Sequence, residues 1–134
     1  MKNFVFISPN FPTSYWMFCK ELKKNGKFVN FDCVSDGDTI LFAINKKSAD
    51  LKQYIERAYV SKDGFTVDIP ENGDVFYPSD QKSFKNGVGV AALKKTKKGL
   101  LYMDRIHTSK DTVFEEKNIE FLVNGSIELT RIIE

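Results

Sequence analysis

The segment Met1–Gly26, MKNFVFISPNFPTSYWMFCKELKKNG, predicts the folding unit around which the rest of the chain is organised. Its apolar run Phe4–Ile7 is typical of a buried strand, which ends where two prolines fix φ and remove backbone donors. Apolar residues then recur at helical spacing from Tyr15 to Leu22, and Gly26 provides a C-terminal stop. We therefore expect a strand, a proline-containing loop and a helix.

The same segment resembles the opening of certain bacterial ATP-grasp proteins. The likeness is carried by residues 3–12 (NFVFISPNFP), 15–19 (YWMFC) and 22–26 (LKKNG), roughly the first fifth of the chain. The resemblance implies the first strand and helix of a domain that precedes an ATP-binding core. The family's ATP-binding and metal-binding residues lie far downstream in a longer chain, so none of them is carried over to this sequence.

The composition indicates one domain that spans residues 1–134. Hydrophobic residues make up 42% of the chain, which is enough for a core, and 28% are charged. A formal charge of +2 lacks the basic excess of most nucleic-acid binders. Cys19 and Cys33 show no CxxC spacing and are expected as buried thiols. With no secretory signal and no apolar run of bilayer length, the sequence predicts a cytoplasmic protein that contacts no membrane.

The middle of the chain predicts two strands, a helix and a further strand. Phe28–Val34 and Thr39–Ile44 are expected to pair as a hairpin around the turn signal at residues 36–37, Asp-Gly. Ser48 is the expected cap of a helix that continues to Ala58, because apolar residues follow at helical spacing. Phe65–Ile69 alternates apolar and polar residues like a half-buried strand. Together with the first unit, the order is β-α-β-β-α-β, the ferredoxin-like arrangement.

The remainder of the chain predicts β-structure. A loop over residues 70–87, with one possible short strand at 75–77, precedes Val88–Leu93 and Leu100–Ile106, which flank a lysine-rich turn. A strand at 112–115 and a last hairpin, Ile119–Val123 with Ser126–Ile133, follow. The predicted fold is therefore a single α+β domain, a mostly antiparallel sheet with two helices, β-α-β-β-α-β followed by C-terminal β-hairpins.

No reaction centre is predicted. His107 is the only histidine, and although Asp104 and other polar residues are close in sequence, an exposed turn residue is the expected role. The carboxylates of Asp32, Asp36 and Asp38 allow a cation site, but their spacing fits a turn better than a calcium loop. We therefore expect no catalytic residue, no metal and no cofactor.

Two groups of residues are candidate interaction sites. One is a lysine cluster at the predicted turn, which either grips anions or protects a sheet edge from pairing: Lys94, Lys95, Lys97 and Lys98. The other is an aromatic group around the proline-containing loop, which either offers anchors for a protein partner or packs under the C-terminal sheet: Phe11, Tyr15 and Trp16.

These groups predict a small non-catalytic binding protein that acts on a protein partner through surface aromatics and a lysine-rich hairpin tip. One alternative is a truncated ATP-grasp-related protein that binds a nucleotide or a small substrate. A second is a weak RNA binder, since a βαββαβ sheet can present aromatic side chains to bases, although Asp38–Asn45 lacks the glycines and paired aromatics of that motif.

Overall fold

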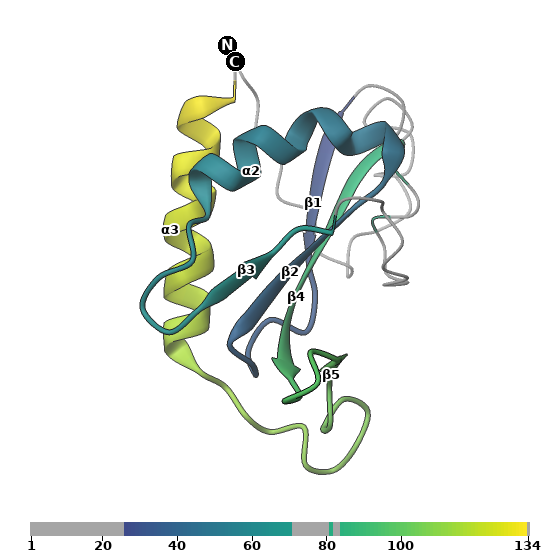
Figure 1. Ribbon diagram of the computed structural model, residues 1–134, viewed down its shortest axis with the longest axis vertical. Coiled ribbons are helices and arrows are strands. Elements are labelled where there is room, and N and C mark those ends of the chain that lie inside the picture. Colours follow the sequence, from purple (N-terminus) through teal and green to yellow (C-terminus); the bar gives the residue numbers. More distant parts are fainter. Residues whose placement is uncertain (1–25, 71–80, 82–83, 134) are drawn as a thin grey trace, which may run out of the picture.

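The structure, a computed structural model, describes residues 26–70, 81 and 84–133. Within these ranges a mixed β-sheet carries helices on one face (Figure 1). The elements in chain order are β1 (Lys27–Phe31), β2 (Thr39–Ile44), the 3-10 helix η1 (Lys46–Leu51), α2 (Lys52–Ala58), β3 (Thr66–Asp68), β4 (Asn86–Lys95), β5 (Leu101–Tyr102) and α3 (Glu116–Ile132).

The sheet has the order β1-β4-β2-β3, and β5 pairs with the end of β4. β4 is parallel to β1 and antiparallel to β2, and β2 is parallel to β3. The α+β class is confirmed, but the prediction of a mostly antiparallel sheet is wrong, because two of the three pairings along this path are parallel. The predicted hairpin between residues 28–34 and 39–44 is also wrong, because β4 lies between β1 and β2. β4 is buried on both faces over residues 87–93, and such a strand belongs in the middle of a sheet.

Several predicted elements are confirmed. The second predicted helix is present as η1 and α2, although Asn45 rather than Ser48 provides the cap: its Oδ1 accepts hydrogen bonds from the backbone N–H groups of Lys47 and Ser48. The predicted strand at 65–69 is β3, and the predicted strand at 88–93 lies within β4. Of the strand predicted at 100–106, only Leu101–Tyr102 forms, as β5. No strand forms at 112–115. The predicted first strand and helix, and the possible strand at 75–77, lie outside the described residues.

The predicted C-terminal hairpin is wrong, because residues 116–132 form the single helix α3. Both a strand pair and a helix can bury the apolar residues of this stretch. The helix is selected by packing, since Asn118, Phe121, Leu122, Gly125 and Leu129 form one buried stripe against the rest of the molecule. Tertiary contacts therefore override the turn signal at residues 124–125, Asn-Gly.

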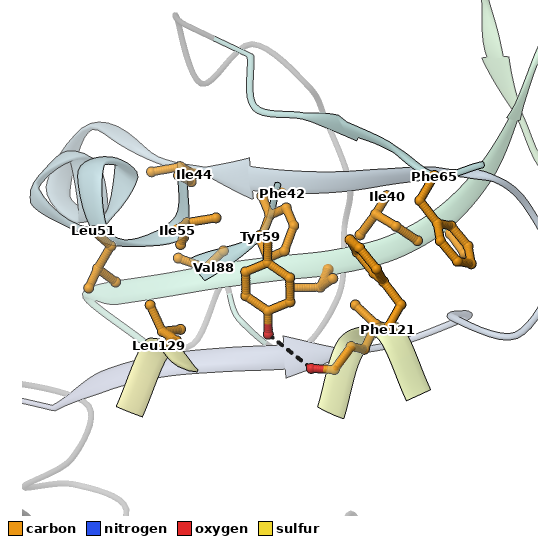
Figure 2. Packing of buried hydrophobic residues seen from close by; sticks show 13 residues of the cluster. Ile40, Phe42, Ile44, Leu51, Ile55, Tyr59, Phe65, Val88, Phe121 and Leu129 are labelled. Atoms are coloured by element: carbon orange, nitrogen blue, oxygen red, sulfur yellow. Dashed lines mark hydrogen bonds between the residues drawn. The ribbon is translucent and has the colours of Figure 1, made fainter. Parts of the chain in front are cut away.

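The main core lies between the sheet and its helices (Figure 2). Alternate residues of β2, including Ile40 and Phe42, contribute to it together with Ile55, Tyr59 and Phe121 from the helical side. The Tyr59 hydroxyl donates to the Leu122 carbonyl oxygen at 3.2 Å, which ties the end of α2 to α3 (Figure 2). Tyr59 thus links the two helices. Of the helices in the described ranges, none is long and apolar enough to cross a membrane.

Candidate functional site

The lysine-rich turn connects β4 to β5 at the end of the sheet opposite α2 (Figure 1). Thr96 organises the turn: its backbone N–H donates to the Leu100 carbonyl oxygen at 2.9 Å, and its Oγ1 accepts from the Leu100 N–H at 3.0 Å. Gly99 closes the turn with a φ of 84°, a conformation that L-residues with side chains rarely adopt. The turn therefore has a defined backbone, which sets the point at which each lysine side chain leaves the chain.

Lys94 differs from the other lysines of the cluster. Its Nζ lies 2.9 Å from Oδ1 of Asp104 and 3.1 Å from Oδ2 of Asp36, which also accepts a hydrogen bond from Arg105 at 3.2 Å. The hydrogen bond that Lys94 donates to Asp104 raises the pKa of the Lys94 ammonium, and the same bond lowers the pKa of the Asp104 carboxyl. Lys94 is thus a structural anchor that joins the hairpin to the loop over residues 32–38.

The other three lysines, Lys95, Lys97 and Lys98, are exposed. Among the described residues none of the three makes an ion pair, so each ammonium is available to a partner. We call these three residues the cationic tip.

Two apolar side chains beside the cationic tip were not predicted as site residues. Leu100 is 67% exposed and Tyr102 is 41% exposed. The neighbouring residues Leu101 and Met103 pack against a small second cluster that includes Leu41 and lies on the face of the sheet opposite the main core. Because side chains alternate between the two faces of a strand, the sequence could have predicted that Leu100 and Tyr102 are exposed when Leu101 and Met103 are packed.

The loop that carries Asp36 is held by the segment before α3 and by α3 itself. Ser35 accepts a backbone hydrogen bond from Glu115, and the Gly37 carbonyl oxygen accepts one from the buried Asn118 side chain at 2.7 Å. Gly37 has a φ of 139°, and a Cβ there would lie 2.5 Å from the Leu93 carbonyl oxygen, so only glycine fits. The anchor of the hairpin is therefore assembled from segments that are far apart in the sequence.

The remaining predicted candidates are the aromatic group, His107 with Asp104, and Cys33. Phe11, Tyr15 and Trp16 lie outside the described residues. His107 is exposed in a turn, and Asp104 is engaged by Lys94. Cys33 follows β1 in a half-buried position with a φ of 55°, so it is neither in a strand nor fully buried. Within the described ranges, no three or more side chains of His, Cys, Asp or Glu are arranged to hold a metal ion.

Comparisons with known proteins add no relative: no family model, no curated protein and no solved structure matches the chain.

Proposed function

We propose that this protein is a non-catalytic binding protein that docks onto an acidic surface of a partner protein through the cationic tip. The observation that carries the proposal is the contrast within one lysine cluster. Lys94 is neutralised by two carboxylates, whereas Lys95, Lys97 and Lys98 make no ion pair among the residues that the structure describes. Three like charges that a fold leaves unpaired at one turn form a positive patch that attracts anions.

The anchoring of the hairpin supports a binding role. β4 is buried along most of its length, and ion pairs from Lys94 and Arg105 hold the base of the hairpin to Asp36. A tip whose backbone is already ordered loses little backbone entropy when it binds. The cationic tip is therefore preorganised.

Exposed Leu100 favours a protein as the partner. An apolar side chain beside the lysines can bury its surface against a partner, and that burial stabilises a complex that charge alone would form weakly. Exposed Tyr102 favours a second candidate, single-stranded nucleic acid, because bases stack on aromatic rings. The near-neutral total charge of +2 makes this second candidate the weaker one.

Two labelled probes separate these candidates: a peptide of alternating glutamate and leucine, and a single-stranded RNA of mixed sequence. We expect fluorescence anisotropy to show binding of the peptide that weakens when salt is raised from about 50 mM to about 200 mM. Tight binding of the RNA with no binding of the peptide would contradict the proposal of a protein partner and favour nucleic acid as the ligand.

A triple variant tests the residues themselves. Replacing Lys95, Lys97 and Lys98 by glutamine is expected to abolish the salt-sensitive part of peptide binding. A control that removes the same charge elsewhere, at the exposed lysines Lys46, Lys47 and Lys110, should bind as the unmodified protein does. Equal loss of binding in both variants would show that only net charge matters, and the proposed tip would be wrong.

The aromatic group Phe11, Tyr15 and Trp16 stays a predicted second contact, which Trp16→Ala tests in the same assay. The ATP-grasp-related alternative is tested by thermal unfolding with ATP and magnesium. A ligand at a hundred times its dissociation constant stabilises a protein by about 2.7 kcal/mol. A rise in the melting temperature that corresponds to this gain in stability would favour nucleotide binding over the interaction role.

A further inference from the structure

A pocket of about 480 Å³ lies between α3 and the segment that leads from the end of α2 to β3. It is separate from the cationic tip, since none of the hairpin residues lines it. Its volume falls within the range of small-molecule sites, about 300–1,000 Å³. The pocket does not depend on the function proposed above.

The floor of the pocket is apolar and partly aromatic. The rings of Phe65 and Phe121 stack with their centroids 4.7 Å apart and an angle of 28° between their planes. Beside them lie Ala58 and Gly125, and the missing side chain of Gly125 leaves room for the ring of Tyr59. Phe65 is only 6% exposed and Phe121 8%, so the floor offers a small part of each residue to an apolar group of a ligand.

Charges of both signs line the same pocket. Lys62 and Lys117 are its cations, and the Lys117 Nζ lies 6.0 Å from the centre of the Phe65 ring. Asp63 and Glu120 are carboxylates of the pocket, and in the described part of the chain these four groups make no ion pair with one another or with other residues. A third carboxylate, that of Glu128, is paired with Arg131 at 3.5 Å.

We propose that this pocket binds a small zwitterion with an aromatic body, namely an α-amino acid with an aromatic side chain. The ligand's carboxylate would pair with Lys62 and Lys117, its ammonium with Asp63 and Glu120, and its ring would contact the small exposed part of Phe65 and Phe121. A ligand with only one charge leaves either the cations or the carboxylates of the pocket without a partner. The charge pattern therefore favours the zwitterion over an aromatic acid or an aromatic amine.

Nuclear magnetic resonance titration of the whole protein tests the proposal with three probes: L-phenylalanine, 3-phenylpropionate and phenethylamine. We expect L-phenylalanine to shift the backbone amide signals of Phe65, Asn124 and Gly125. Each singly charged probe should bind about two- to fivefold more weakly, the ratio that one partly exposed ion pair produces. Equal affinity for all three probes, or shifts that lie outside the pocket, would overturn the proposal, as would the absence of any shift.

Two variants on the exposed side of α3 assign the charges. Lys117→Gln should weaken L-phenylalanine and 3-phenylpropionate by about two- to fivefold and leave phenethylamine unchanged. Glu120→Gln should weaken L-phenylalanine and phenethylamine and leave 3-phenylpropionate unchanged. Lys110→Gln, a control at an exposed lysine that does not line the pocket, should change none of the three. If both pocket variants weaken all three probes alike, the two charges do not select the ligand and the proposal fails.

Discussion

Gly125 is the position at which one added methyl group should do the most damage. A Cβ there would lie 2.1 Å from Cε1 and 2.3 Å from Cδ1 of the Tyr59 ring. The ring is only 2% exposed, and its hydroxyl contacts the Leu122 carbonyl oxygen and lies 2.7 Å from the Ser126 Oγ. Phe42 packs against it with a centroid distance of 4.7 Å, so the ring has little room to move (Figure 2).

Two opposing effects decide the stability of Gly125→Ala. Alanine favours a helix over glycine by about 1 kcal/mol, whereas overpacking a filled core costs about 1–3 kcal/mol. Because two ring atoms lie well inside contact distance, we expect the upper end of that cost and a net loss of about 2 kcal/mol. For a domain of this size the melting temperature then falls by about 6–10 °C, which circular dichroism measures directly.

A second background shows whether the Tyr59 ring is the cause. In Tyr59→Leu the obstruction is smaller, so Gly125→Ala should become neutral or stabilising there, which gives a coupling energy of about 2–3 kcal/mol between the two sites. Asn124→Ala, one residue earlier on the exposed side of α3, is the control and should not destabilise. If Gly125→Ala raises the melting temperature of the otherwise unchanged protein, the packing of α2 on α3 described here is wrong.

Three further predictions concern the links between the elements. Burial raises the pKa of Tyr59 to about 12, although the Ser126 hydrogen bond opposes this. The neutral phenol therefore stabilises the fold fully below pH 10, and this contribution of about 2–3 kcal/mol to the free energy of unfolding is lost as pH rises from 10 to 12. Urea unfolding at pH 9 and pH 11.5 should show the loss in the unmodified protein and not in Tyr59→Phe. Asp36→Asn removes the carboxylate shared by Lys94 and Arg105 and should cost about 0.5–1 kcal/mol at low salt, a difference that should shrink at high salt; an unchanged difference would exclude an ionic origin. Asn118→Ala leaves the Gly37 carbonyl oxygen without its buried donor and should cost about 1–3 kcal/mol in urea unfolding, whereas a cost near zero would mean that α3 does not hold the loop.

Local signals were sufficient where an element depends on its own residues. The helical spacing after Ser48 predicted η1 and α2, and the alternation at 65–69 predicted β3. The lysine-rich turn was also predicted correctly, because a polar turn with glycine between two apolar runs has few alternatives. The three lysines of the cationic tip could therefore be named from the sequence, and so could their exposure.

The sequence was misleading where glycine serves packing between distant segments. The Asp-Gly pair at 36–37 indicates a hairpin turn, but Gly37 is needed because the backbone of Leu93 passes close to it. The Asn-Gly pair at 124–125 also indicates a turn, but Gly125 makes room for the ring of Tyr59. In both cases the residue that packs against the glycine is far away in the sequence, so rules based on neighbouring residues cannot predict the contact.

The same reasoning explains why the anchor of the cationic tip could not be predicted. Lys94 looked like one more member of a solvated cluster, and only the folded chain brings Asp36 to it. Asp36 reaches that position because Gly37 allows the loop to approach Leu93 and because Asn118 of α3 holds the loop from the other side. Since the hairpin, the loop and α3 meet at this point, a substitution at Asn118 should loosen the base of the hairpin although it touches no lysine. The fixed position of the tip is thus a property of the tertiary structure, and its charge a property of the sequence.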